Sequence, residues 1–264
     1  MPKTILLTGA TDGIGLETAK MLAADGHRVL LHGRNPKKLE TVAQALADQG
    51  GQIESYVADL SRLTDVEALA QAVSDKHKKL DVLINNAGIF KTPAPITPDG
   101  FDVRFVVNTI APYLLTQRLL ALMDASGRVI NLSSAAQAPV DPDALAGRVH
   151  LSDDFDAYAQ SKLALTMWSR HMAQAHEDGG PVIVAVNPGS LLDSKMVKEA
   201  FGQSRGGVEI GAAILVRAAL SDEFKEATGQ YFDNDSGRFA PPHPDALDER
   251  RCEEVVRGIE AIIS

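Results

Sequence analysis

Short runs of aliphatic and β-branched residues alternate along the chain with longer stretches of strong helix formers. Runs such as Ile5-Leu6-Leu7 and Val182-Ile183-Val184 are apolar at every position, which is typical of strands buried on both faces of a parallel sheet. The stretches between them have the composition of helices, and right-handed crossovers through such helices build a doubly wound sheet. The alternation therefore predicts an α/β fold, with one parallel sheet and helices on both faces. We expect strands at Thr4–Thr8, Arg28–Leu31, Ile53–Val57, Val82–Asn85, Val129–Leu132 and Val182–Val186, and helices at Leu16–Ala24, Lys37–Asp48, Asp65–Lys76, Phe101–Met123, Ala157–His176 and Val208–Leu220.

Length and composition narrow the class of protein. A chain of 264 residues with 45% hydrophobic and 23% charged side chains can form a single domain around one core. The formal net charge of -9 repels phosphate backbones and anionic lipid headgroups, so we expect neither nucleic acid nor a membrane as a partner. The first apolar run, Ile5–Leu7, is too short for a signal peptide or a membrane span. Because Cys252 is the single cysteine and the seven histidines show no metal-ligand spacing, we expect a cytoplasmic protein without a bound metal.

Three glycines lie between the first expected strand and the first expected helix. Gly9 permits a tight turn, Gly13 lets backbone amides approach phosphate oxygens, and Gly15 allows the helix to pack closely on the strand. The positive end of the helix dipole then faces the anion. The pattern predicts the pyrophosphate site of a dinucleotide, although the same glycines also fit an ordinary glycine-rich turn. The candidate cofactor-binding residues of this turn are Gly9, Thr11, Asp12, Gly13, Ile14 and Gly15.

The second expected strand ends in His32-Gly33-Arg34-Asn35, where a dinucleotide site meets the adenosine ribose. An acidic residue at this point would bind a free 2′-hydroxyl and repel a 2′-phosphate, but the sequence has none. Arg34 can bind that phosphate and stack on adenine. The sequence therefore favours NADP(H) over NAD(H), with Arg34 and Asn35 as candidate binding residues. Alternatively, Arg34 is a solvated turn residue beside the helix that starts at Asn35-Pro36.

Tyr158 and Lys162 lie four residues apart in an expected helix, so their side chains share one face. A cation about 5 Å from a phenol, at an effective dielectric constant of about 20, stabilises the phenolate by roughly 3 kcal/mol, or about 2 pKa units. Tyr158 would then act as a general acid or base near neutral pH. A strand-end hydroxyl, from Ser133 or Ser134, can hydrogen-bond a substrate oxygen in the same crevice. An isolated pair with this spacing also fits an exposed helix surface, but the cofactor turn upstream favours the catalytic interpretation.

The glycine spacing, with three residues between the first two glycines, and the Tyr158–Lys162 pair resemble the short-chain dehydrogenase/reductase superfamily, in the branch shorter than its epimerase-like members. The resemblance implies a Rossmann fold and a nicotinamide cofactor that exchanges hydride with a carbonyl or an alcohol. It also implies that Lys162 holds the nicotinamide ribose. The implied catalytic set is Asn108, Ser134, Tyr158 and Lys162. Further cofactor contacts are implied after the third, fourth and sixth strands, from Asp59, Leu60, Asn86, Ala87, Gly88, Pro188, Gly189 and Ser190.

Alternatives stay open at several of these positions. Asp12 stands where some NADP-preferring relatives carry a basic residue. Ser194 is an alternative to Ser190 as the hydroxyl beside the nicotinamide. Asp59 also fits a helix cap, and Asn85-Asn86 also fits a simple turn. By the same resemblance we expect a last strand at Gly229–Phe232 and a final helix at Leu247–Ile262.

Two irregular segments, residues 135–157 and 190–207, follow strand ends and are expected to form the walls of the substrate pocket. Between Ser134 and Tyr158 stand 23 residues, more than is usual in the superfamily. This longer segment resembles the retinol dehydrogenase-like and WW-domain oxidoreductase-like members. Glycines in the second segment fit either a lid or a loose surface loop. We expect a mixed apolar and acidic pocket lining from Pro139, Val140, Leu145, Asp153 and Phe155.

Pro112 follows Asn108 by four residues inside an expected helix. Proline has no N–H, so the Asn108 carbonyl loses its usual helical donor. We hypothesise that this carbonyl holds a water of a proton relay near Lys162. A simple helix kink is the alternative.

Together these residues predict an NADP(H)-dependent oxidoreductase for a small-molecule carbonyl or alcohol, with Tyr158 as general acid or base. A catalytically silent NADP-binding sensor and a purely structural subunit are the alternatives, and the candidate catalytic set argues against both. By the resemblance, the helices at Phe101–Met123 and Ala157–His176 could pair across a twofold axis in a homodimer or homotetramer.

Overall fold

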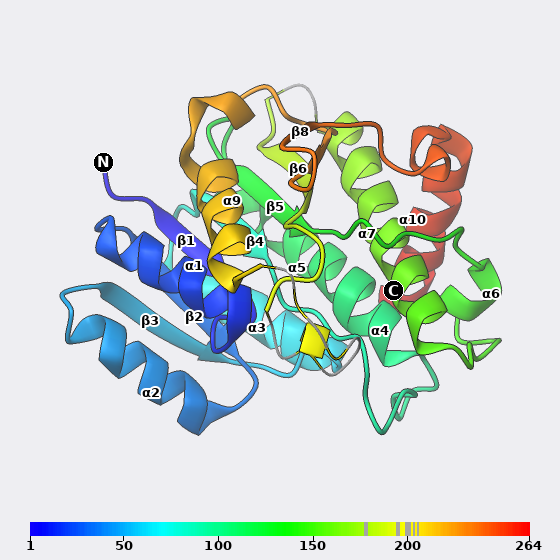
Figure 1. Ribbon diagram of the computed structural model, residues 1–264, viewed down its shortest axis with the longest axis horizontal. Helices are drawn as coiled ribbons and strands as arrows, with labels where there is room; N and C mark the ends of the chain where they lie inside the picture. Colours follow the sequence, from blue (N-terminus) through cyan, green and yellow to red (C-terminus); the bar gives the residue numbers. More distant parts are fainter. Residues whose placement is uncertain (177–178, 194–195, 199–201, 203, 205) are drawn as a thin grey trace.

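The centre of the protein, seen in a computed structural model, is an eight-stranded sheet of order β3-β2-β1-β4-β5-β6-β7-β8 (Figure 1). The structure describes residues 1–264 except 177–178, 194–195, 199–201, 203 and 205. Strands β1 to β7 are parallel, and β8 pairs antiparallel with β7 at the edge. The predicted doubly wound α/β fold is confirmed. The strands are β1 (Thr4–Leu7), β2 (Arg28–Gly33), β3 (Gln52–Val57), β4 (Val82–Asn85), β5 (Arg128–Leu132), β6 (Val182–Asn187), β7 (Tyr231–Asp233) and β8 (Arg238–Phe239).

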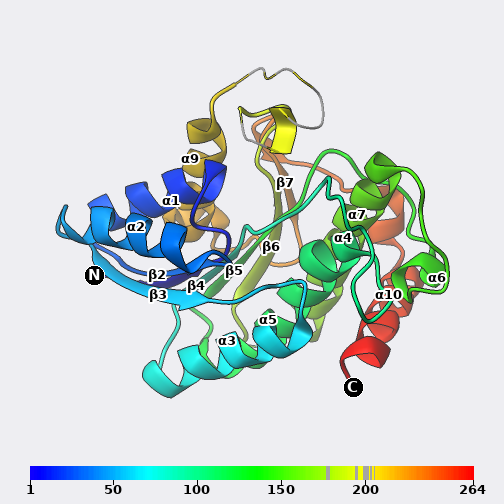
Figure 2. The same ribbon diagram turned by 90° about the horizontal axis from the view of Figure 1, so that it is seen from below.

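Helices cover both faces of the sheet (Figure 2). Helices α1, α2 and α9 lie on one face, whereas α3, α5 and α7 lie on the other, where α10 packs against α7. The helices are α1 (Gly13–Ala24), α2 (Pro36–Ala47), α3 (Leu63–Lys76), α4 (Val103–Phe105), α5 (Ala111–Leu119), α6 (Pro142–Leu145), α7 (Asp154–Ala175), α9 (Val208–Leu220) and α10 (Glu249–Ile263). A π-helical turn, η1 (Val106–Ile110), joins α4 to α5, and 3-10 turns form η2 (Leu120–Leu122), η3 (Asp222–Phe224) and η4 (Pro244–Leu247).

The apolar strands separate two hydrophobic cores. In β1, Leu6 belongs to the core under α3, α5 and α7, whereas Ile5 and Leu7 belong to the core under α1 and α9. All three side chains are fully buried. Successive side chains of a strand point to opposite faces, so a strand covered on both faces must be apolar throughout.

The strand order reverses between β1 and β4, and this reversal positions the site. Strand β1 pairs with β2 on one side and with β4 on the other, so Leu7 lies beside both Leu31 and Ile84. From this point the helical connections run toward opposite edges of the sheet. An open α/β sheet binds its ligands in the crevice at such a switch point, outside the carboxyl ends of the strands.

The expected helix Phe101–Met123 is interrupted in the structure. It begins at Val103, passes through the π-helical turn η1 and resumes as α5, with Pro112 in the first turn of α5. The Ala111 N–H donates to the Val106 carbonyl, which inserts one extra residue where Pro112 has no N–H to donate. The helical stretch Val103–Leu122 is long and apolar enough to span a membrane by length and composition alone, but 67% of its apolar window is buried inside the protein.

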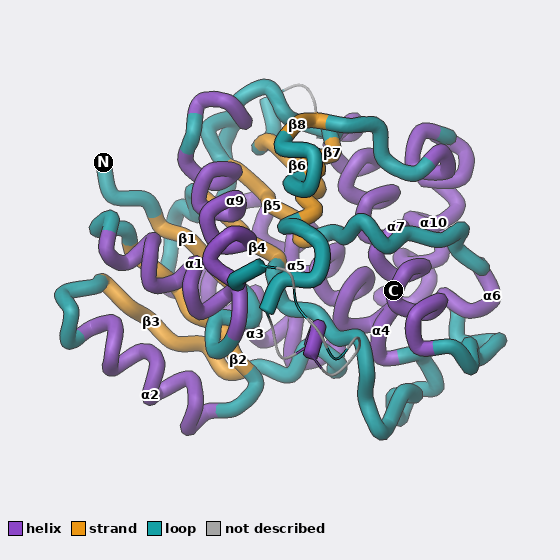
Figure 3. The backbone as a smooth tube through the Cα atoms, in the orientation of Figure 1, coloured by secondary structure: helices purple, strands orange, loops and turns teal. Residues whose placement is uncertain are grey.

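The helix that carries Tyr158 starts earlier than the sequence predicted. It begins at Asp154 and not at Ala157, because the Asp153 side chain accepts a hydrogen bond from the Asp156 N–H and caps the first turn. Ser and Asp caps of this kind satisfy helix donors that have no intrahelical partner. The segment between β5 and α7, drawn mostly as loop in Figure 3, also contains the short helix α6. The final residues of the expected pocket segment 135–157 are therefore helical.

Candidate active site

The glycine turn after β1 is shaped for close backbone approach. Gly9 and Gly13 have φ angles of +67° and +51°, which favour glycine. A Cβ atom on Gly15 would lie 2.2 Å from the Gly9 carbonyl oxygen and 2.5 Å from Asn86 Nδ2, so no other residue fits there. Helix α1 begins at Gly13 and directs its N-terminus at this turn. The predicted residues Gly9, Thr11, Asp12, Gly13, Ile14 and Gly15 therefore form one continuous strand-to-helix turn at the switch point.

Asn86 and Ala87 fasten the end of β4 to the end of β1. Asn86 Nδ2 donates to the carbonyls of Thr8 and Gly9, at 2.9 and 3.1 Å. The Thr8 hydroxyl oxygen accepts from the backbone N–H groups of Asn86 and Ala87, both at 3.0 Å. The Asn86 amide NH₂ group is therefore engaged by the protein's own backbone. Together these contacts set the position of the glycine turn. Thr8 was not among the predicted site residues, although its place directly before Gly9 was visible in the sequence.

The end of β2 presents an exposed basic edge next to the turn. Arg34 is exposed, while the Asn35 side chain accepts from the Lys38 N–H and caps α2. Lys38 Nζ lies 2.7 Å from Asp12 Oδ2, and Asp12 also caps α1. Two basic side chains, Arg34 and Lys38, thus stand at the predicted ribose position. The sequence argument missed Lys38, which is one helical turn beyond Arg34.

The residues after β3 have different environments. The Asp59 side chain accepts from the backbone and the hydroxyl of Ser61, at 3.0 and 2.8 Å, and therefore forms a local turn. It does not cap α3, whose N-cap position is Arg62. The Leu60 side chain is buried in the core under α3, so contact of Leu60 with a cofactor would involve its backbone.

Tyr158 and Ser134 meet at the carboxyl edge of β5. The Ser134 side chain lies close enough to the Tyr158 phenol to act on its pKa, and Tyr158 is partly exposed on the first turns of α7. Ser133, in contrast, is buried and bonds through its hydroxyl to Thr166 Oγ1 at 2.7 Å. The structure therefore brings Ser134 to the phenol and turns Ser133 into the interior.

The expected lowering of the Tyr158 pKa is wrong for this arrangement. Burial raises the pKa of Tyr158, and the hydrogen bond with Ser134 offsets only part of that rise. Lys162 Nζ lies 5.8 Å from the centre of the Tyr158 ring, but it donates to the Leu132 carbonyl at 2.6 Å. The ammonium is thus turned toward a backbone oxygen of β5, and desolvation of the phenol dominates.

Lys162 is a buried cation in the centre of the site. Its side chain is 3% exposed, and burial lowers its pKa from 10.5 to about 8. A Cβ atom on Gly88 would lie 3.6 Å from Lys162 Nζ, so the predicted residue after Asn86-Ala87 lies beside the ammonium. The structure therefore joins Gly88, Lys162 and the end of β5 in one cluster.

Asn108 connects the π-helical turn to both neighbouring parts of the site. Its Oδ1 accepts from the Ile89 N–H at 2.8 Å, and its Nδ2 donates to the Ile89 carbonyl and to Ser161 Oγ, both at 2.9 Å. Ser161 directly precedes Lys162, so Asn108 links the segment after β4 to α7. These contacts belong to the side chain, and the relay through the main-chain carbonyl stays a prediction.

The Pro188-Gly189-Ser190 step after β6 is held by the β7–β8 turn. Gly189 has a φ angle of +120°, and Asn234 Nδ2 donates to the Pro188 carbonyl at 2.8 Å. The Ser190 backbone N–H and hydroxyl donate to Asp235 at 2.8 and 2.6 Å. The Ser190 hydroxyl is therefore engaged in holding its own loop. Ser194, the alternative hydroxyl, lies outside the described residues.

Phe90 and Phe155 form an aromatic group with Tyr158. The Phe90 ring lies 5.0 Å from the Tyr158 ring and 6.4 Å from the Phe155 ring, centre to centre. Phe155 is 47% exposed, whereas Leu145 is buried in the core. A role of Phe155 in a pocket lining stays a prediction, and Phe90, which follows Gly88-Ile89 in the sequence, was not among the predicted residues.

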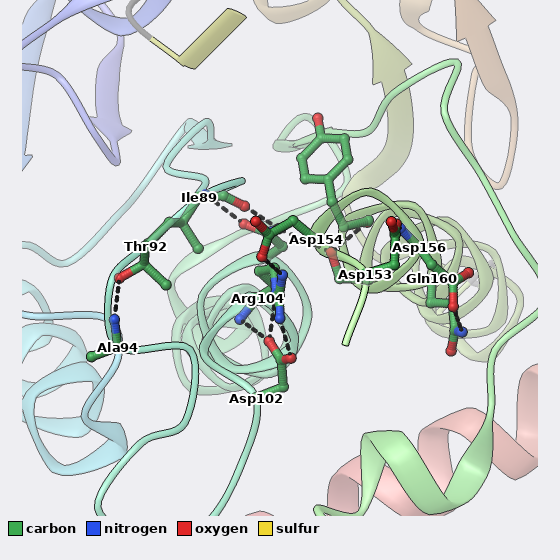
Figure 4. Close-up of polar contacts among 12 residues, drawn as sticks. Ile89, Thr92, Ala94, Asp102, Arg104, Asp153, Asp154, Asp156 and Gln160 are labelled. Atoms are coloured by element: carbon green, nitrogen blue, oxygen red, sulfur yellow. Dashed lines mark hydrogen bonds and ion pairs between the residues drawn. The ribbon is translucent and has the colours of Figure 1, made fainter. Parts of the chain in front are cut away.

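Arg104 anchors the first turn of α7 (Figure 4). Its guanidinium donates to both carboxylate oxygens of Asp102, at 2.8 and 2.6 Å, and to Asp154 Oδ1 at 2.6 Å. Arg104 and Asp102 are 1% and 2% exposed. Because Asp154 begins α7, this buried ion pair joins α4 to the helix that carries Tyr158.

Known proteins are similar to this one in sequence and structure over most of its length. A family model described as short chain dehydrogenase matches residues 3–205. Retinol dehydrogenase 13 of Homo sapiens is 30% identical over 98% of this chain and 82% of its own length, and retinol dehydrogenase 12 of Mus musculus is 34% identical over 87% and 77%. The crystal structure of the angucycline C-6 ketoreductase LanV with bound NADP superposes with a TM-score of 0.68, at 28% identity, over 88% of this chain and 93% of that chain.

We predict that Arg104→Met destabilises the fold strongly. The substitution leaves the buried Asp102 carboxylate without its partner, which costs about 3–5 kcal/mol of unfolding free energy. Arg148→Met is the control, because the Arg148–Asp143 pair is exposed and such pairs contribute about 1 kcal/mol or less. Urea unfolding measures both variants. Equal midpoints for the two would contradict the prediction.

We also predict a pH dependence of stability that arises from Lys162. Its pKa is about 8 in the folded protein and 10.5 as the ordinary value, so the unfolded chain binds more protons between these limits. Stability then rises with pH, by about 2 kcal/mol from pH 8 to pH 10. The free energy of unfolding of Lys162→Met should lack this contribution, so the difference between the two proteins changes over that range. Parallel pH profiles would rule out the assignment.

Proposed function

The chain belongs to the short-chain dehydrogenase family and is an NAD(P)-dependent dehydrogenase or reductase, and on that premise we propose a more specific activity. We propose that it uses NADP(H) to interconvert a carbonyl and an alcohol, with Tyr158 as the general acid or base. The observation that carries the proposal is the contact between Tyr158 and Ser134, one helical turn from the buried Lys162.

The glycine turn supports a dinucleotide at the switch point. Gly15, where a Cβ atom would lie 2.2 Å from the Gly9 carbonyl oxygen, lets the N-terminus of α1 pack closely on the turn, so that the helix dipole and the turn amides can face a phosphate. Gly9 to Gly15 would hold the pyrophosphate, Asp59 to Leu60 and Asn86 to Gly88 the adenosine side, and Pro188 to Ser190 the nicotinamide side. Lys162 would hold the nicotinamide ribose. The bound cofactor supplies or accepts the hydride.

The chain's own residues handle the proton. In the direction of carbonyl reduction, Tyr158 donates a proton to the substrate oxygen, and its raised pKa keeps the phenol protonated at neutral pH. The Ser134 hydroxyl holds the same substrate oxygen in line with the phenol. In the direction of alcohol oxidation, Tyr158 must first lose its proton, and a charged Lys162 in the next turn favours the phenolate. The raised pKa of the phenol thus suits a general acid in the direction of reduction.

The choice of NADP(H) rests on charge at the end of β2. Arg34 and Lys38 provide two exposed cations, and the position offers no carboxylate after Gly33. A 2′-phosphate would compete with Asp12 for Lys38 and gain a planar donor from Arg34. The NADP bound in LanV supports the same choice.

The remaining sequence predictions extend this proposal. We infer a cytoplasmic enzyme that acts on a small-molecule carbonyl or alcohol, without nucleic acid, membrane or metal, as a homodimer or homotetramer. The support is the acidic composition and the single cysteine, Cys252.

Tyr158→Phe should lower turnover by about two to four orders of magnitude, because it removes the proton donor and little volume. Binding of NADPH, followed by fluorescence titration, should stay within about twofold of wild type. Tyr113→Phe is the matched control, because the Tyr113 hydroxyl bonds to Glu260 away from the site. Turnover of Tyr158→Phe equal to that of the control would leave a protein that binds the cofactor but uses another chemistry.

Arg34→Ala and Lys38→Ala should each weaken NADPH binding by roughly tenfold and leave NADH binding unchanged, because only NADPH carries the 2′-phosphate. Lys20→Ala is the control, since Lys20 pairs with Glu17 on the exposed side of α1. The measurement is the ratio of the two dissociation constants. An equal loss for both cofactors would argue against a phosphate contact.

A further inference from the structure

We propose that His32 is a positioning residue of the cofactor site, which holds the turn after β1 and the end of β3 at the spacing that an adenosine phosphate requires. The proposal rests on the proposed function, because its readout is the binding of NADPH. His32 lies in β2 between the two elements and is 3% exposed, so its ring touches neither substrate nor reacting atoms.

The imidazole makes one hydrogen bond at each end. The Gly9 N–H donates to Nδ1 at 3.2 Å, and Nε2 lies 3.1 Å from the Ala58 carbonyl oxygen. A backbone N–H can only donate, so Nδ1 carries no proton and Nε2–H is the donor to Ala58. Burial lowers the pKa of His32 to about 4, which keeps this neutral tautomer at physiological pH.

Both backbone groups lie just beyond regular sheet pairing. The β1–β2 ladder ends at Leu7–Leu31, and the chain turns at Gly9 with a φ of +67°. The β2–β3 ladder ends at Gly33–Val57, one residue before Ala58. A buried N–H or carbonyl without a partner is costly, and the His32 ring supplies an acceptor to one group and a donor to the other.

The two groups that His32 joins are parts of the adenosine half of the site. Gly9 opens the glycine turn, Ala58 precedes Asp59, and Arg34 follows His32 by two residues. The other half of the site is built on β4, β5 and β6, where Tyr158 and Lys162 stand. A change at His32 should therefore alter the affinity for the cofactor far more than the rate of the chemical step.

Three substitutions at His32 separate its two bonds. His32→Leu removes both bonds. His32→Asn can place an oxygen at the Nδ1 position and keep the acceptor for Gly9, whereas His32→Gln can place an NH₂ at the Nε2 position and keep the donor to Ala58. We expect His32→Leu to weaken NADPH binding by about tenfold, and His32→Asn to recover most of that loss, because Gly9 belongs to the phosphate turn. Turnover at saturating NADPH should stay within about twofold.

His77→Leu is the matched control. His77 is also a buried histidine. It lies at the C-terminal end of α3 and is hydrogen-bonded to Tyr56 and Glu54. Its loss should lower the melting temperature without changing the NADPH dissociation constant. A purely structural role of His32 would instead make NADPH affinity follow melting temperature in all four variants.

Fluorescence titration with NADPH and thermal melting decide the question without any need for turnover. Weaker binding in His32→Leu with recovery in His32→Asn supports the proposal, and if His32→Leu does not fold, weaker binding in His32→Gln than in His32→Asn supports it. Wild-type affinity in a folded His32→Leu, or the same loss in His77→Leu, overturns it. A wild-type protein that binds NADPH and reduces nothing would overturn the proposed enzyme and leave the role of His32 standing.

Discussion

The arrangement of the strand ends at the carboxyl edge of the sheet depends on one close contact. Two backbone segments and an amide side chain approach each other there so closely that no Cβ atom fits between them. Gly15 lies against the Gly9 carbonyl, and Asn86 closes the gap from β4 with bonds to Thr8 and Gly9. This contact holds the N-terminus of α1 at the switch point of the sheet. The positive end of the helix and the turn amides then face a single position, which is the one proposed for the pyrophosphate.

Polar contacts hold α7, the helix that carries Tyr158, in place beside the sheet. Arg104 holds its first turn through Asp154, and Asn108 and Thr109 bond to the Ser161 side chain and carbonyl. Farther along, Ser133 bonds to Thr166, and Asn131 bonds to Ser169. Hydrogen bonds are directional, so this series sets the rotation of α7 as well as its distance from β5. Tyr158 and Lys162 consequently point to one edge of the sheet.

The charge state of the site follows from burial. Lys162 is desolvated and satisfied by a backbone carbonyl, and Tyr158 is desolvated beside Ser134. Desolvation thus shifts both groups toward their neutral forms, but Lys162, with a pKa of about 8, stays charged at neutral pH. A negatively charged cofactor in the crevice would raise the pKa of Lys162, and the charged Lys162 would favour a phenolate at Tyr158. In the proposed enzyme, cofactor binding and proton transfer would thus be coupled through one ammonium group.

Much of the fold was predictable because its signals are local. Apolar runs predicted six of the seven parallel strands in the described part of the chain, and the glycine turn predicted the start of α1 within a few residues. The resemblance to short-chain dehydrogenases is confirmed, including its retinol dehydrogenase-like features. Boundaries were less accurate where a cap or a proline intervenes. Asp153 starts α7 three residues early, and Pro112 follows a π-helical turn in what was expected to be one helix.

The sequence by itself determined the fold class, the family and the identity of the turn and helix that form the site, because strand periodicity, glycine spacing and the four-residue spacing of Tyr158 and Lys162 are properties of neighbouring residues. Only the tertiary structure decided which serine meets Tyr158, which way Lys162 points and what His32 and Arg104 do. Each of these depends on a group that is 23 or more residues away, and burial, which sets the pKa values, arises only when the helices close over the sheet.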